Sequence, residues 1–168
     1  MKRETGVRVG FGFDAHRFAK GRKLVLGGVL FPKERGLAGH SDADVLSHAV
    51  TDAVLGAAGL GDMGAHFPDT DRRWRGADSL GLLKEAVRLA AARGKRAVNA
   101  DVTLIGEKPR IAAVRRRMEA NLARALGISA AGVNVKGKTT EGMGFTGQGE
   151  GLAAMAVVLL ENATRLER

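Results

Sequence analysis

The apolar residues of this chain change between a two-residue period and a helical period several times, and this change limits the fold more than any other sequence feature. Alternation or a short apolar run predicts strands at residues 7–13, 24–31, 97–106, 132–138 and 152–161, the last with a short helix as the alternative. Apolar side chains at helical spacing predict helices at residues 46–57, 80–93 and 110–126. The predicted fold class is α+β, a small mixed β-sheet with helices packed on one face.

Several residues mark the expected element boundaries. Ser41 is expected to cap the first helix, with Asp44 as the acid of a capping box. Pro109 is expected to open the third helix. Within the strand at 24–31, Gly27 and Gly28 indicate a bulge or a close approach. One face of such a sheet would stay open, and we expect a second copy of the chain to cover it.

Length and cysteine content narrow the class of protein. The 168 residues are 45% hydrophobic, which suits a single domain over residues 1–168. The chain has no cysteine, so it has no disulfide framework, and a bound metal must take histidine and carboxylate ligands. No apolar run is long enough for a membrane span, and the first ten residues lack the apolar part of a secretory signal. A cytoplasmic protein is expected.

The net charge of +9 favours an anionic partner. Nucleic acid, a phosphorylated metabolite and a membrane surface are the candidates, and the alternative is a surplus spread over solvated faces. Aromatic residues make up only 4%, with no tyrosine and one tryptophan, which is poor material for stacking on bases. We therefore expect neither a nucleic-acid nor a membrane partner, although a basic nucleic-acid-binding module stays a rival interpretation.

The histidines indicate a metal site. Asp14 and His16 lie two residues apart at the end of a predicted strand, so their side chains point to one side, roughly 6.6 Å apart along the strand. His48, in the first predicted helix, can supply a third ligand, and one carboxylate with two imidazoles is typical of an open catalytic zinc site. His40 would lie about 12 Å from His48 along a helix axis, too far to share the ion. It is instead a candidate for phosphate binding, and ordinary surface or core histidines are the alternative for all of these.

Two further segments carry residues suited to phosphate groups. Residues 136–151 combine five glycines after residue 141 with lysine and threonine donors, while Glu141 suits a hard cation that bridges phosphates. Residues 106–110 precede a predicted helix, whose free N–H groups can bind a phosphate or a base edge. A purely structural turn is the alternative for the first segment. The three arginines at 115–117 point in different directions and are expected to be solvated.

Five blocks of sequence carry a resemblance to a known family. They are GFDAH at 12–16, the stretch 39–64, FPDTD at 67–71, DVTLIGEKPR at 101–110 and VKGKTTEGMGFTGQGEG at 135–151. In this order they closely resemble the 2-C-methyl-D-erythritol 2,4-cyclodiphosphate synthases, cyclising lyases of non-mevalonate isoprenoid biosynthesis, over residues 7–161. The resemblance implies a homotrimer of α+β subunits with active sites between subunits. It also implies a cytidine diphosphate substrate, 4-diphosphocytidyl-2-C-methyl-D-erythritol 2-phosphate, and release of CMP.

The resemblance implies a role for individual residues. Asp14, His16 and His48 match the Zn²⁺ ligands, Glu141 matches a ligand of a second ion, Mg²⁺ or Mn²⁺, and His40 and Thr139 match the pair assigned to transition-state stabilisation. The positions matching substrate-binding residues are Asp14, His16, His40, Ser41, Asp62, Met63, Gly64, Phe67, Pro68, Asp69, Thr70, Asp71, Gly106, Glu107, Lys108, Pro109, Arg110, Ile111, Ala112, Lys138, Thr139, Thr140, Glu141, Phe145 and Gln148. Of these, residues 106–112 match a cytidine pocket supplied by the neighbouring subunit.

One position departs from the family pattern. Many members carry arginine where this chain has Gln148, and that arginine faces a cavity on the threefold axis, which Phe145 also lines. Glutamine has neither the charge nor the bidentate fork of arginine, so the resemblance does not predict binding of isoprenoid diphosphates there. A metal-dependent phosphohydrolase that uses water as nucleophile is the rival enzyme; it would give a linear product in place of a cyclic one.

Overall fold

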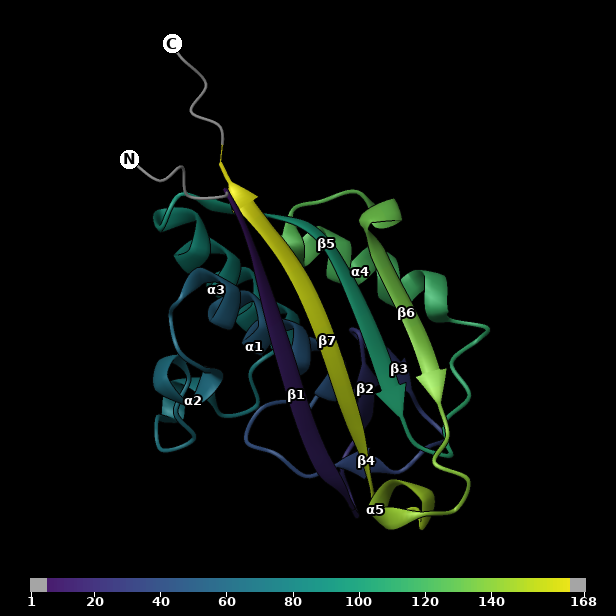
Figure 1. The fold of residues 1–168 in the computed structure, drawn as a ribbon. Helices are drawn as coiled ribbons and strands as arrows, with labels where there is room; N and C mark the ends of the chain where they lie inside the picture. Colours follow the sequence, from purple (N-terminus) through teal and green to yellow (C-terminus); the bar gives the residue numbers. More distant parts are fainter. Residues whose placement is uncertain (1–5, 164–168) are drawn as a thin grey trace.

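The computed structural model describes residues 6–163, and its main element is a five-stranded sheet with the long helices behind it (Figure 1). The predicted domain, residues 1–168, extends past this range at both ends. The strands are β1 (Val7–Ala19), β2 (Leu24–Leu26), β3 (Val29–Phe31), β4 (Gly36–Leu37), β5 (Lys95–Ile105), β6 (Val133–Lys138) and β7 (Gly151–Asn162). The helices are α1 (Val45–Ala58), α2 (Met63–His66), α3 (Ser79–Ala92), α4 (Arg115–Leu126) and α5 (Gly144–Gly147), with 3₁₀ turns at Arg72–Trp74 and Ala130–Gly132. The predicted α+β class is confirmed.

The sheet is mixed, with strand order β4-β1-β7-β5-β6. β7 pairs antiparallel with both β1 and β5, whereas β5 and β6 run parallel. The register places Asp14, Ala154, Leu104 and Gly137 in one row across four strands. Parallel strands end at the same edge, so the segments that follow β5 and β6 leave the sheet side by side (Figure 1).

Two glycines in β1 let α1 pack directly on the strand backbone. A Cβ on Gly10 would lie 1.8 Å from the carbonyl oxygen of Ala53, and a Cβ on Gly12 would lie 1.9 Å from that of Ala49. Only glycine permits so close an approach between a strand and a helix. The α1 residues at this contact, Ala49, Ala53 and Ala57, are all alanine, which keeps the two backbones close. This contact sets the height of α1 above the sheet.

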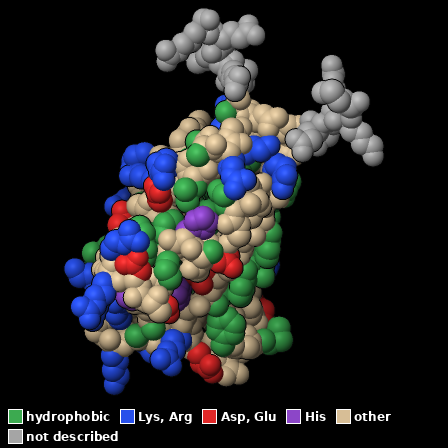
Figure 2. All heavy atoms as spheres, turned by 90° about the vertical axis from the view of Figure 1, so that its left-hand side faces the viewer, with side chains coloured by type: hydrophobic (Ala, Val, Ile, Leu, Met, Phe, Trp, Pro, Cys, Tyr) green, Lys and Arg blue, Asp and Glu red, His purple; other side chains and the backbone are tan. Residues whose placement is uncertain are grey.

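The other face of the sheet carries exposed apolar side chains. Phe11 is 61% exposed and Val9 65% exposed, and Phe13 of β1 lies opposite Met155 of β7, which is also exposed. Hydrophobic side chains form a strip down one side of the molecule in Figure 2. Contiguous apolar surface of this kind is typical of an interaction site. No helix within residues 6–163 combines the length and the apolar character that crossing a bilayer requires.

Two predicted strands differ in the structure. The segment 24–31 is a hairpin rather than one strand, because Gly27 and Gly28 both adopt positive φ angles, 54° and 68°, and form its turn. The first strand runs to Ala19 instead of ending at residue 13, since it pairs with β7 from Val7 to Arg17 and then with β4 at Phe18 and Ala19. Asp14 and His16 therefore lie within a strand.

Two predicted helix starts are wrong. α1 begins after Asp44, which accepts a hydrogen bond from the backbone N–H of Ser47, so Asp44 rather than Ser41 is the N-cap. α4 begins at Arg115, and Pro109 lies in the preceding loop after a cis peptide bond. Residues 106–114 are therefore a loop that covers the end of the sheet, and the segment 106–110 is not at a helix N-terminus.

Candidate active site

Three side chains from two elements converge behind the sheet. Asp14 and His16 come from β1, and His48 comes from the first turn of α1. Asp14 Oδ2 lies 2.9 Å from His16 Nε2 and 2.8 Å from His48 Nδ1, and the two histidine nitrogens are 3.1 Å apart. We call these three residues the triad. One carboxylate oxygen and two imidazole nitrogens, all within 4.8 Å of one another, form a donor set that fits Zn²⁺.

The second nitrogen of His48 has its own partners. His48 Nε2 lies 3.0 Å from the hydroxyl oxygen of Ser41 and 2.9 Å from that of Ser79. The Ser79 hydroxyl in turn donates to the carboxylate of Asp42. When His48 is neutral, such a chain holds its proton on Nε2 and leaves the lone pair of Nδ1 for a metal ion. The imidazole is thereby oriented for metal binding.

Contacts within the triad shift the pKa values of Asp14 and His48. Burial raises the pKa of Asp14, but hydrogen bonds from His16 and His48 and their charges outweigh it, so the pKa of Asp14 lies below its ordinary value. Burial lowers the pKa of His48, but the hydrogen bond and charge of Asp14 outweigh this effect, and the pKa of His48 lies above its ordinary value. An ionised carboxylate that attracts a proton to the adjacent imidazole also attracts a metal cation.

His40 lies in a basic cavity next to the triad. The cavity measures about 520 Å³, and its lining consists of Arg22, Gly39, His40, Asp69, Thr70, Arg72, Arg75 and Gly76. A Cβ on Gly39 would lie 3.4 Å from Cε1 of His16, so the cavity adjoins the triad. Arg22 donates to the carbonyl oxygens of Leu37 and Ser41 and thereby holds the loop that carries His40. The structure thus brings Asp69 and Thr70 into the same cavity as His40.

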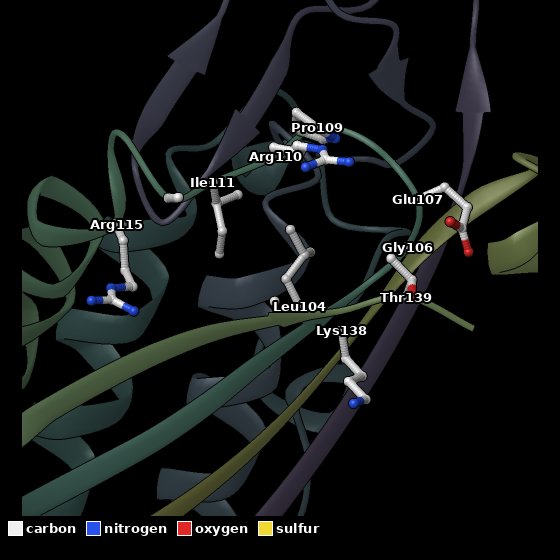
Figure 3. Close-up of a pocket in the computed structure, with 11 residues that line it drawn as sticks. Leu104, Gly106, Glu107, Pro109, Arg110, Ile111, Arg115, Lys138 and Thr139 are labelled. Carbon is white, nitrogen blue, oxygen red and sulfur yellow. The ribbon is translucent and has the colours of Figure 1, made fainter. Parts of the chain in front are cut away.

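A second cavity, of about 400 Å³, lies at the end of β5 and β6 (Figure 3). Its lining consists of Leu104, Gly106, Glu107, Pro109, Arg110, Ile111, Ala112, Arg115, Gly137, Lys138 and Thr139. It combines apolar walls from Leu104 and Ile111 with the cationic side chains of Arg110, Arg115 and Lys138. That composition suits a flat apolar group joined to an anion. The cavity brings most of the residues 106–112 together with Lys138 and Thr139.

Within one chain the triad and the second cavity are separate. The cavity lining contains no triad residue. Asp14 and Gly137 lie in one row but three strand spacings apart, about 14 Å. A single phosphate cannot contact both the triad and Thr139 of the same chain at that separation.

The remaining predicted site residues lie around these two regions. Asp62 caps α2, and Met63 and Gly64 form its first turn, held by a hydrogen bond from Met63 N–H to Asp52. The buried Phe67 packs edge-on against Trp74, next to Pro68. Asp71 lies in the following turn. Its carbonyl oxygen is 3.3 Å from His40 Nε2, and its carboxylate pairs with Arg73.

The glycine-rich segment after β6 splits between two places. Thr140 and Glu141 form the turn beside the second cavity, where the Thr139 hydroxyl donates to Glu141 at 2.5 Å. Phe145 and Gln148 belong to α5 and its C-cap, outside the lining of either cavity, and Phe145 is 44% exposed. Lys108 lies at the cis bond before Pro109.

Several residues of the site were not found from the sequence. Ser79 and Asp42, which hold His48, are 31 and 6 positions away from it, and no local pattern links them. Asp52, which anchors α2, lies one helical turn after His48 on α1. This i, i+4 spacing puts the two side chains on one face of the helix, so the sequence could have indicated that Asp52 lies near the site. Arg115 is exposed, as expected, and it also lines the second cavity, which the sequence did not indicate.

Comparison with known proteins decides the family. A sequence model of the YgbB family matches residues 7–161. The chain belongs to the YgbB family. A curated relative of this YgbB chain from Rubrobacter xylanophilus is 60% identical over 161 residues, which cover 94% of this chain and 97% of the relative. That relative is named 2-C-methyl-D-erythritol 2,4-cyclodiphosphate synthase, so the resemblance found in the sequence is confirmed.

Solved structures agree with the YgbB assignment. The bifunctional IspDF of Campylobacter jejuni superposes with a TM-score of 0.89 at 41% identity, over 93% of this chain and 42% of that protein. This chain therefore spans less than half of the bifunctional protein. IspF of Plasmodium falciparum, solved as a CDP complex, superposes with a TM-score of 0.82 at 30% identity, over 96% and 99% of the two chains.

Proposed function

We propose that this chain converts 4-diphosphocytidyl-2-C-methyl-D-erythritol 2-phosphate to 2-C-methyl-D-erythritol 2,4-cyclodiphosphate and CMP. The observation that carries the proposal is the pairing of a metal-type triad with a separate cavity formed by the two segments assigned to cytidine and phosphate. The names of the relatives at 53–60% identity support the same reaction.

The reaction is an internal phosphoryl transfer. An oxygen of the 2-phosphate attacks the β-phosphorus, the bond from that phosphorus to the bridging oxygen breaks, and CMP leaves with the electron pair. A phosphate oxygen is already anionic, so no general base is needed. The chain must instead hold the 2-phosphate at about 3–3.5 Å from the β-phosphorus and offset the repulsion between the anions. His40, with the arginines that line its cavity, would hold the 2-phosphate.

The side chains for two metal ions are assigned as follows. Asp14, His16 and His48 would hold Zn²⁺, and Glu141 would supply one ligand of Mg²⁺ or Mn²⁺, with phosphate oxygens as the others. When bound, such ions withdraw charge from the phosphates as Lewis acids. The Thr139 hydroxyl, which donates to Glu141 in this structure, would turn to donate to a phosphate oxygen in the transition state once Glu141 binds the ion.

We infer that the working unit is a homotrimer in which the triad of one subunit faces the second cavity of its neighbour. The separation of about 14 Å within one chain supports this arrangement, because the reacting phosphate must contact both the triad and Thr139. The exposed apolar strip of β1 and β7 offers surface for the contact. We place the enzyme in the cytoplasm, in keeping with a chain that has no cysteine to oxidise.

Product analysis tests the reaction. The protein is supplied with the cytidyl substrate, Zn²⁺ and Mg²⁺, and the products are separated by chromatography. CMP together with the cyclic diphosphate supports the proposal. A linear hydrolysis product would instead support the phosphohydrolase, and absence of CMP would reject both.

Co-expression of two inactive variants tests the shared site. Asp14→Ala removes the triad of its subunit, and Thr139→Ala removes the hydroxyl in the second cavity. If sites form between subunits, random mixing leaves about a quarter of the interfaces with both groups intact, and activity returns to that extent. If each subunit holds a complete site, the mixture stays inactive. Sedimentation then reports the subunit number.

A further inference from the structure

Glu107 lies on the rim of the second cavity, but its carboxylate does not point into it. Figure 3 shows the side chain directed away from Leu104, Ile111 and Arg115. Glu107 Oε1 accepts hydrogen bonds from the backbone N–H of Thr140 at 3.2 Å and of Gly142 at 3.4 Å. The carboxylate therefore joins the loop after β5 to the loop after β6.

The loop that Glu107 holds has an unfavourable backbone conformation. Glu141, between the two N–H groups, has φ of 53°, a left-handed value that costs a non-glycine residue about 1 kcal/mol or more. Gly142 follows with φ of 77°. A conformation of this kind persists only where surrounding contacts hold it, and the two hydrogen bonds to Glu107 span the strained residue.

The same loop positions the groups assigned to phosphate. Thr139 donates its hydroxyl to Glu141, so the orientation of both side chains depends on the turn at 140–142. The backbones of the two loops also meet, where Gly106 N–H donates to the carbonyl oxygen of Lys138 at 2.9 Å. A cytidine held by residues 106–112 would thus be linked through Glu107 to the Thr139 hydroxyl.

We propose that Glu107 is a positioning residue, which fixes the Thr139–Gly142 turn through its backbone and couples it to the nucleotide loop. This differs from a contact between Glu107 and the substrate, the role that the sequence suggested. The proposal rests on the proposed function, since its kinetic test requires turnover of the cytidyl substrate. It predicts that an acceptor atom is needed at this position and a negative charge is not.

Three variants test this. In Glu107→Ala both N–H groups lose their acceptor, and kcat falls by about tenfold to a hundredfold because Thr139 is misplaced. The Kd for CDP, measured by calorimetry, changes less than about threefold, because the cavity walls are intact. Glu107→Gln keeps one carbonyl oxygen as acceptor and recovers most of the lost kcat. Glu85→Ala, at a partly exposed glutamate on α3 that pairs with Arg88, is the matched control with kcat unchanged.

Amide exchange provides a readout that needs no substrate. In the wild-type protein the amides of Thr140 and Gly142 exchange more slowly than that of Glu141, and Glu107→Ala removes the difference. The proposal is overturned if those wild-type amides are unprotected, if Glu107→Ala keeps full kcat, if CDP affinity falls as much as kcat, or if Glu107→Gln is as impaired as Glu107→Ala. Failure of the wild-type protein to release CMP would reject the proposed function alone, because the exchange result stands without it.

Discussion

The α-carbon of Gly12 in β1 faces the carbonyl oxygen of Ala49 in α1, and a Cβ on Gly12 would lie only 1.9 Å from that oxygen. Ala49 directly follows His48, and Asp14 lies two residues after Gly12. The closeness of these two backbones therefore decides whether the imidazole of one element reaches the carboxylate of the other. The absence of a side chain at Gly12 therefore allows the metal-type triad to form.

Substitution of Gly12 by alanine tests this dependence. The added methyl group meets backbone atoms that cannot rotate away, so α1 must shift. We expect a loss of at least about 1–3 kcal/mol in the free energy of unfolding, measured in urea, together with reduced zinc content. Gly56→Ala is the matched control, because Gly56 is exposed within α1 with nothing near its Cβ position, and a gain of about 0.5–1 kcal/mol is expected. Equal stability of Gly12→Ala and wild type would contradict the packing argument.

Removal of a triad side chain tests the metal assignment. Asp14→Ala and His48→Ala should each lower zinc content, measured by atomic emission, and CMP release in parallel, because each removes one of three ligands. His66→Ala is the control, since His66 hydrogen-bonds to the carbonyl oxygen of Leu60 outside the triad, and its zinc content should equal that of wild type. Full zinc occupancy in Asp14→Ala would reject the assignment.

Ser79→Ala tests the support behind the triad. The substitution removes a hydroxyl that lies between His48 Nε2 and Asp42, and it leaves the three ligands in place. Loss of an outer-shell partner typically lowers metal affinity about 10- to 100-fold, and competition with a chelator measures that change. Unaltered zinc affinity would mean that Ser41 alone orients His48.

Zinc affinity should depend on pH in a definite direction. Asp14 holds the pKa of His48 above its ordinary value in the metal-free protein despite burial, so a proton competes with the metal at pH values below that pKa. Affinity should therefore increase as the pH rises above about 6.5, the ordinary histidine pKa, and level off only once the pH exceeds the raised pKa of His48. Calorimetric titrations across that range measure it. A flat profile would show that no proton leaves the triad on binding.

Asp44→Ala tests how much a buried carboxylate contributes to the free energy of unfolding. The Asp44 carboxylate is fully buried and accepts from the N–H groups of Gly27, Gly28 and Ser47 and from the Ser47 hydroxyl. Asp44→Ala leaves these donors without an acceptor and should lower the free energy of unfolding by roughly 3 kcal/mol or more. Asp78→Ala, which removes only the N-cap of α3, should cost about 1 kcal/mol. Similar losses in the two variants would contradict the role of Asp44 in tying the β2–β3 turn to α1.

Helix interiors were predictable because their apolar stripes are local. The stripes at 46–57 and 80–93 correspond to α1 and α3 within two residues at each end. Helix starts were less predictable, since the side chain of a candidate capping residue can hydrogen-bond to other groups than the helix N-terminus. Ser41 contacts the imidazole of His48 instead of capping a helix, and residues 106–114 follow the end of the sheet and delay α4 until Arg115.

Residue order alone specifies the alternation of strands and helices, the donor types available to a metal, and the family. These depend on residue identity, spacing and order along the chain. Three relationships became visible only in the folded chain: His48 meets Asp14 across 34 positions, Ser79 orients His48, and Glu107 holds the turn at 140–142. The physical reason is that strand register and the height of a helix above a sheet are set by packing between distant segments, which no local period encodes.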